Sequence, residues 1–188
     1  MKTTVSILCL FLSIALSAQE KATSVYPWEF GFSLGATRSA ITANLPENKF
    51  GFELGIHTKK RFGKSFAFNP GVYFGYNEAS TGGRTIFKQY LSFTPSVLYQ
   101  FKPDGNSPYL SLGPNIKHRI ASNEEEITTN LLPSSYGADL GVGWFCDLKH
   151  FNLQTEVRYS YGFNNMRNLL GFFPVNYHSI GVYFQFID

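Results

Sequence analysis

Apolar side chains recur at every second position in eight separate segments of the chain, and this period limits the possible folds more than any other feature. In the segment 49–58, Phe50, Phe52, Leu54 and Ile56 alternate with small or polar residues. Successive side chains of a β-strand point to opposite faces, so a period of two predicts a strand with one apolar and one polar face. The eight predicted strands cover residues 28–37, 49–58, 65–77, 87–101, 108–120, 136–147, 151–163 and 177–187.

The links between these predicted strands alternate between long and short. We expect short turns at 59–64, 102–107 and 147–150, where "KPDGNSP" carries clear turn chemistry. Long loops are expected at 38–48, 78–86, 121–135 and 164–176. An even number of alternating strands, each about 10 residues long and joined by alternating long and short links, indicates an antiparallel barrel.

Alternation alone fits two kinds of barrel. A soluble carrier hides its apolar face inside, whereas a membrane barrel turns that face to lipid. Three features favour the membrane barrel. Gly and Ser are frequent on the polar face, where small side chains leave room inside a narrow barrel, and the link lengths alternate as in outer-membrane barrels. Aromatic residues also gather near the strand ends, where they would form interface girdles: Trp28, Tyr76, Tyr99, Phe101, Trp144, Phe151, Tyr161 and Phe163.

We therefore predict an all-β protein, an eight-stranded antiparallel transmembrane β-barrel in an outer membrane, with both termini in the periplasm. The first 18 residues have the charged start, apolar stretch and small-residue end of a secretory signal. The predicted organisation is a cleaved signal peptide over 1–18, a short N-terminal segment over 19–27 and the barrel over 28–188. Outer-membrane lipid is the expected partner, and other envelope or secretion proteins are further candidates.

Charged residues on the inward face are the candidate functional residues. An eight-stranded barrel is filled by its own side chains, and a buried charge is costly without a partner. We expect a lumenal polar network that pairs between strands, with a proton or ion path or a ligand site at the lumen mouth as the functional alternative. The predicted members are Glu53, Lys88, Lys117, Arg119, Asp139, Glu156 and Arg158.

Glu156 and Arg158 lie two residues apart in "TEVRYSYGFNN", and therefore share one face of a strand. We expect their partners on other strands rather than in each other. The basic residues between Lys59 and Lys64 are expected to be solvated at the periplasmic end. The loop 164–176 holds an apolar cluster, which we expect over the barrel mouth or in the headgroup region, with a partner site as the alternative.

Catalytic and metal-binding patterns are weak in this sequence. No serine with a nearby histidine and acid stands out, and no two histidines have the spacing of a metal site. The four histidines are His57, His118, His150 and His178. We expect no enzyme activity, no metal and no cofactor. The net charge of +3 and the absence of a basic stripe argue against nucleic acid as a partner.

Several stretches resemble the small outer-membrane β-barrel proteins that include the PorT family. They are "YLSFTPSVLYQFK" (90–102), "SPYLSLGPNIKHRI" (107–120), "GADLGVGWFCDL" (137–148), "TEVRYSYGFNN" (155–165) and the final "HSIGVYFQFID". The resemblance implies a signal-bearing outer-membrane barrel of a Gram-negative bacterium, without a catalytic motif. PorT itself is tied to assembly of the type IX secretion system. The expected function is therefore a non-enzymatic structural or interaction role, accessory to protein secretion or envelope assembly. A narrow passive solute pore and an outer-membrane lipid-modifying enzyme are the alternatives.

Overall fold

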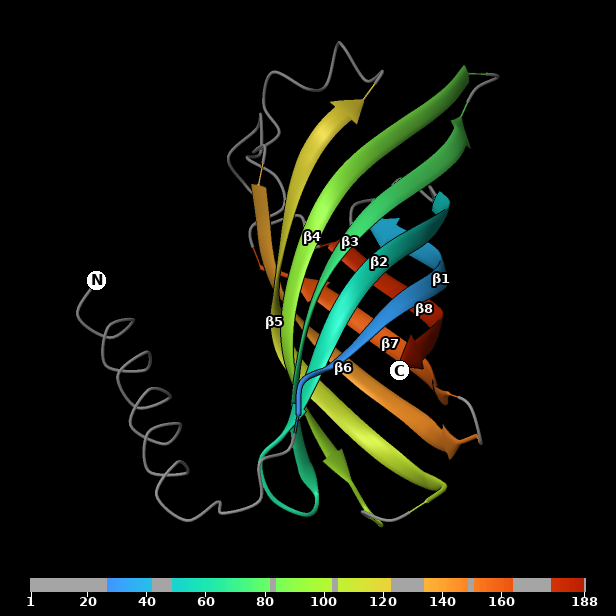
Figure 1. Ribbon diagram of the computed structural model, residues 1–188. Coiled ribbons are helices and arrows are strands. Elements are labelled where there is room, and N and C mark those ends of the chain that lie inside the picture. The colour runs from blue at the N-terminus through green and yellow to red at the C-terminus, as the bar shows by residue number, and fades with distance from the viewer. Residues whose placement is uncertain are drawn as a thin grey trace, which may run out of the picture.

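The computed structural model describes residues 27–41, 49–81, 84–102, 105–122, 134–148, 151–163 and 177–187. In these residues, eight antiparallel strands form a closed barrel in which each strand pairs with its sequence neighbours and β8 closes against β1 (Figure 1). The predicted eight-stranded antiparallel barrel is confirmed. Its strands are β1 (Glu29–Ile41), β2 (Lys49–Arg61), β3 (Phe66–Thr81), β4 (Arg84–Gln100), β5 (Ser107–Ser122), β6 (Ser134–Asp147), β7 (Asn152–Gly162) and β8 (Tyr177–Ile187).

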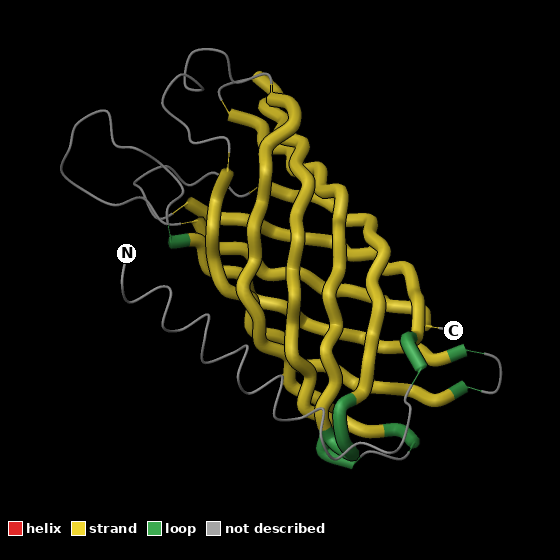
Figure 2. Tube along the Cα trace, turned by 60° about the vertical axis from the view of Figure 1, so that its left-hand side comes forward, coloured by secondary structure: helices red, strands yellow, loops and turns green. Residues whose placement is uncertain are grey.

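The short turns lie at the end of the barrel where β1 begins and β8 ends, which we call the turn side (Figure 2). The opposite end is the loop side. Within the described residues, no helix is long and apolar enough to cross a membrane. The predicted signal peptide, residues 123–133 of the predicted loop 121–135, His150 and the apolar loop 164–176 lie outside the described residues.

The predicted long loop at 78–86 is wrong. β3 and β4 stay paired as far as Thr81 opposite Arg84, so most of these residues extend a hairpin on the loop side (Figure 1). The polar composition of "EASTGGRTI" suggested a loop, although Gly82-Gly83 is a typical two-residue hairpin signal. Strands pair through backbone hydrogen bonds, which do not require apolar side chains. The pairing of β3 with β4 can therefore extend past the segment in which apolar residues alternate.

The two faces of the barrel are those that the alternation predicts. Phe32, Leu112 and Val142 point outward and keep 58%, 61% and 56% of their surface exposed. The inward face carries small and polar residues together with tyrosines, of which Tyr73 is 1% and Tyr183 is 3% exposed. A protein with its apolar side chains outside and its polar side chains inside suits a lipid surrounding rather than water.

Inward glycines provide the space that the tyrosine rings occupy. A methyl group added at Gly35 would overlap the ring of Tyr183, and one added at Gly75 would overlap the ring of Tyr90. The prediction that small inward residues make room for large neighbours is therefore correct in detail. Because the barrel is narrow, each large inward side chain needs a small one on an adjacent strand.

Outward aromatic rings gather toward both ends of the barrel. On the turn side, Phe32 stacks on Phe186 with ring centroids 4.7 Å apart, and Phe151 lies 6.0 Å from Phe186. On the loop side, Phe52 stacks on Tyr76 at 5.6 Å. Two aromatic bands separated by aliphatic side chains are the arrangement found at the two interfaces of a membrane.

An arginine placed on the outward face should cost stability in proportion to its depth in the membrane. Leu140 lies midway along β6 with 53% of its surface exposed, whereas Ile120 lies near the loop-side end of β5. We expect Leu140→Arg to destabilise the folded barrel by about 2–4 kcal/mol, and Ile120→Arg by roughly 0–1 kcal/mol. Urea unfolding in lipid vesicles, followed by tryptophan fluorescence, measures both changes. Equal costs at the two positions would contradict a membrane-embedded outward face.

Candidate functional site

Glu53 is the centre of a polar cluster inside the barrel. This residue of β2 is 3% exposed, and both of its carboxylate oxygens accept hydrogen bonds from tyrosines. The hydroxyl of Tyr90 on β4 donates to Oε1 at 2.7 Å, and that of Tyr183 on β8 donates to Oε2 at 2.8 Å. Lys117 Nζ on β5 lies 3.6 Å from Oε1. The cluster therefore connects strands that are not neighbours in the sheet.

Glu156 and Arg158 on β7 bind each other, so the prediction that each would pair only with other strands is wrong. The Arg158 Nε–H donates to Glu156 Oε1 at 2.6 Å, and both side chains are buried. Residues two apart on a strand share a face, and in this narrow lumen the guanidinium stays beside its own strand. Contacts with other strands come from tyrosines instead. The hydroxyl of Tyr109 donates to Glu156 Oε2 at 3.1 Å, and the guanidinium carbon lies 4.3 Å from the ring centre of Tyr183.

The remaining predicted members lie on the same inward face. Asp139 on β6 is 4% exposed and accepts a hydrogen bond from the side-chain amide of Asn115, a residue outside the predicted set. Lys88 and Arg119 are half-buried nearer the loop side, where β4 pairs with β5. The structure thus brings Glu53 to Lys117 and Glu156 to Arg158.

Sequence reasoning missed the tyrosines that hold these charges together. Tyr90, Tyr109 and Tyr183 alternate with the apolar residues of their strands, but their hydroxyls were not expected as donors to Glu53 and Glu156. A signal was available, because a tyrosine in the polar series of a strand must find a partner for its hydroxyl once it is buried. Tyrosine suits this position because its ring fills space while its hydroxyl satisfies a carboxylate.

The prediction that the basic residues near the short turn would be solvated is wrong for Lys59. It is 1% exposed, and its Nζ lies 3.6 Å from Glu29 Oε2 and 4.3 Å from the ring centre of Phe145. Arg61 Nε lies 3.7 Å from Glu29 Oε1. Because successive side chains of a strand point to opposite faces, those of residues 59 and 61 point into the lumen, whereas Lys60 between them is exposed.

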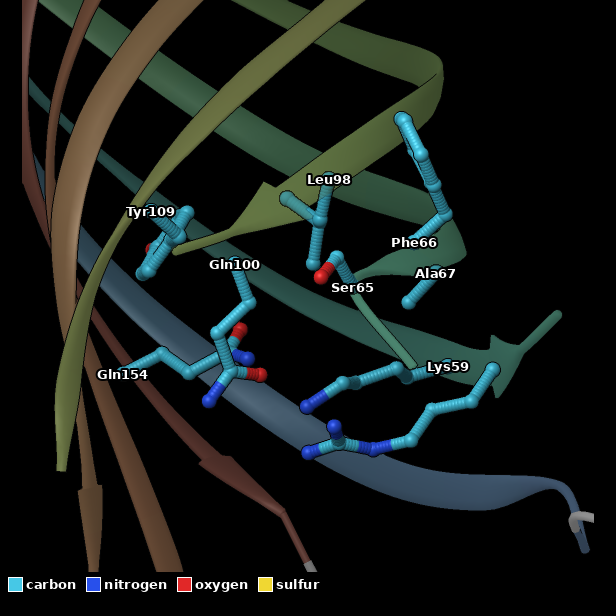
Figure 3. Close-up of a pocket in the computed structure, with 9 residues that line it drawn as sticks. Lys59, Ser65, Phe66, Ala67, Leu98, Gln100, Tyr109 and Gln154 are labelled. Carbon is cyan, nitrogen blue, oxygen red and sulfur yellow. The ribbon is translucent and has the colours of Figure 1, made fainter. Parts of the chain in front are cut away.

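A small pocket opens among the inward side chains on the turn side, and the side chains of Lys59 and Gln154 reach into it (Figure 3). The room between these side chains is about that of a single water molecule. Its lining comes from β2, β3, β4, β5 and β7 and from the turn before β3, and consists of Lys59, Arg61, Ser65, Phe66, Ala67, Leu98, Gln100, Tyr109 and Gln154.

The histidines occupy separate places. His57 is buried on the inward face, as its position in the alternation predicts. On the outward face near the loop side, His118 Nδ1 lies 2.9 Å from Ser134 Oγ, and His178 Nδ1 lies 2.5 Å from the hydroxyl of Tyr159. Within the described residues, no group of three His, Cys, Asp or Glu residues could hold a metal ion.

Loss of the Glu156 carboxylate should leave the Arg158 cation buried beside aromatic rings. We expect Glu156→Ala to destabilise the folded barrel by about 3–5 kcal/mol, because removing one partner of a buried ion pair leaves an uncompensated charge. Glu156→Gln, which keeps an acceptor oxygen, should cost less. Glu78→Ala removes an exposed carboxylate bonded to Tyr76 and serves as the control, with little expected change. Urea unfolding in detergent gives the three midpoints, and an unchanged midpoint for Glu156→Ala would mean that the pair is solvated.

Comparison with known proteins agrees with this architecture. Among solved structures, the outer membrane enzyme PagL is similar at a TM-score of 0.51 and 15% identity, over 81% of this chain and 97% of that one. Neisserial surface protein A is similar at a TM-score of 0.49 and 15% identity, over 83% and 95%. The attachment invasion locus protein Ail of Yersinia pestis, solved with the heparin analogue sucrose octasulfate, is similar at 0.47 and 14%, over 86% and 99%. No curated protein sequence matches significantly.

At these identities, the likeness to PagL speaks for the fold alone. The family assignment comes from a family model, described as an outer membrane protein beta-barrel domain, which matches residues 17–168 and hence most of the chain. The chain therefore belongs to the outer membrane protein beta-barrel domain family, and the protein is a β-barrel of the outer membrane.

Proposed function

We propose that the protein is a non-enzymatic outer-membrane barrel with a closed lumen, which serves a structural or interaction role accessory to protein secretion or envelope assembly. The observation that carries this proposal is the polar cluster around Glu53. Its contacts reach from β2 to β4, β5 and β8 through the interior of the barrel.

The cluster continues across the lumen without a break. Tyr183 donates to Glu53 and at the same time lies against the guanidinium of Arg158, which binds Glu156. These side chains are buried, so they occupy the cross-section at about the middle of the strands. A passive solute pore needs a continuous aqueous path, and a lumen filled by paired side chains opposes one. The loops and the outward surface then remain as the places where such a barrel can act.

The finer assignment rests on the sequence. The features of residues 1–18 support a cleaved signal peptide ahead of a segment 19–27 and the barrel 28–188, with the turn side in the periplasm. The resemblance of the stretches in 90–165 to the PorT family supports a role near protein secretion in a Gram-negative envelope.

A closed lumen should be electrically silent. We expect the purified protein to produce no steady openings in planar lipid bilayers. The double substitution Tyr90→Ala with Tyr183→Ala removes two rings from the cross-section, and should yield measurable conductance if the variant still migrates as a folded barrel in an unheated gel. Steady channels of nanosiemens size in the unmodified protein would overturn the closed-lumen proposal in favour of a pore.

One specific observation favours a second candidate, a lipid-modifying enzyme. Ser134 and His118 lie within hydrogen-bonding distance on the outward face near the loop side, where lipid headgroups would contact the barrel. A serine hydroxyl beside a histidine nitrogen is the pairing of a nucleophile with its base, and such a pair could cleave a lipid ester. A third group that would orient the imidazole is not found among the described residues, and for this reason the non-enzymatic role is preferred.

Gene deletion in the native bacterium separates the two candidates. We expect deletion to reduce protein secretion or envelope integrity and to leave the membrane lipids chemically unchanged, as judged by mass spectrometry. The variant Ser134→Ala should restore the deletion strain as well as the unmodified gene does. A lipid product that disappears on deletion, and that Ser134→Ala fails to restore, would establish the enzyme instead.

A further inference from the structure

Buried polar atoms without a hydrogen-bond partner are concentrated in one half of the lumen. At mid-lumen, the carboxylates of Glu53 and Glu156 accept bonds from tyrosine hydroxyls and from Arg158. Buried polar groups in folded proteins are nearly always paired, so an accumulation of unpaired ones indicates a place that water or a ligand completes. In the described part of the chain, all such atoms belong to residues in the turn-side half: Glu29, Ser33, His57, Lys59, Asn69, Gln154 and Gln185.

Lys59 is the charged member of this group, and it points into the turn-side pocket (Figure 3). Its ammonium group has three N–H donors, and none of them makes a hydrogen bond. Glu29 lies at ion-pair distance, 3.6 Å, but it also lies 3.7 Å from Arg61 and thus serves two cations. On another side, the ring of Phe145 contacts the ammonium group and holds it in place. Lys59 therefore reaches the pocket with its charge only partly compensated.

Gln154 supplies a second polar atom to the same place. Its side chain is almost fully buried, lines the pocket and leaves Oε1 without a partner. Half a turn of the terminal amide exchanges its oxygen and nitrogen, which would present an N–H donor instead. A buried ammonium group and a rotatable amide that converge on one small space are donors suited to an anion.

We propose that this turn-side pocket binds a single carboxylate group, with Lys59 as its charged anchor and Arg61 and Gln154 as supporting donors. Charge and size both favour a carboxylate. The charges of Lys59, Arg61 and Glu29 sum to one positive charge, which matches a monoanion better than a phosphate dianion. The room is about that of one water molecule, which is enough for one oxygen of a carboxylate to reach the ammonium group but not for a bulkier head group to enter. The turn side faces the periplasm in the orientation proposed above, so the carboxylate would belong to a periplasmic molecule. This assignment of the source depends on that orientation, whereas carboxylate binding in the pocket does not.

Acetate is the simplest probe of the pocket. Carbon-13-labelled acetate is titrated into the full-length barrel in an uncharged detergent at constant ionic strength, and binding is followed by saturation-transfer NMR. We expect saturable binding that Lys59→Met weakens at least about tenfold, because this variant keeps the apolar stem and removes the ammonium group. Lys60→Met changes the adjacent, exposed lysine and should leave the affinity unchanged. Absence of saturable binding, or equal affinity in Lys59→Met and the unmodified protein, would overturn the proposal.

A second variant and two competing anions complete the test. Gln154→Glu places a carboxylate inside the pocket, so it should abolish acetate binding while the barrel still migrates as folded in an unheated gel. Unchanged acetate binding by folded Gln154→Glu would overturn the proposal even if Lys59→Met failed to fold. Phosphate or chloride that displaced acetate at equal or lower concentration would overturn the assignment to a carboxylate. Bilayer conductance tests the closed lumen separately, so the two proposals can fail independently.

Discussion

The structure depends on one requirement, that the peptide groups of a membrane-spanning sheet find hydrogen-bond partners within the protein. Lipid offers no partners, so a sheet can cross only when its last strand pairs with its first. Here β8 pairs with β1 from Ile187 opposite Gly31 to Tyr177 opposite Ile41. With eight strands, this closure produces a narrow lumen, and the contents of that lumen follow from its width.

A narrow lumen accepts charges only with close partners. Large inward side chains alternate with glycines, and the tyrosine hydroxyls reach the carboxylates that the strands bring inside. Tyr90, Tyr109 and Tyr183 each fill space and also donate a hydrogen bond to a carboxylate, so the same side chains serve both packing and electrostatics. The guanidinium of Arg158 also lies against tyrosines, because the rings of Tyr73 and Tyr183 make cation–π contacts with it.

The two halves of the lumen differ in how completely their polar groups are paired. At mid-lumen, the carboxylates, tyrosines and cations satisfy one another, which suits a rigid plug. On the turn side, Lys59 and Gln154 are buried beside a small pocket, and Lys59 Nζ and Gln154 Oε1 have no hydrogen-bond partner. A closed barrel with one incompletely paired end can hold a ligand at that end without conducting, so scaffold and binding site are compatible in one molecule.

The period-two pattern by itself determined the strands and the residues that share each face, because alternation is a local property of neighbouring residues. The choice of lipid for the apolar face came from other sequence features, namely the small inward residues, the alternating link lengths and the aromatic residues near the strand ends. The pattern could not show that Glu156 binds Arg158, that Lys59 is buried over Phe145, or that four inward tyrosines hold the charges. These contacts depend on which side chains face one another across the lumen. Barrel closure and strand register determine which side chains meet, and they bring together residues as distant in sequence as Glu53 and Tyr183. The same distinction explains the 78–86 hairpin, since pairing between strands continued where the local apolar signal had ended.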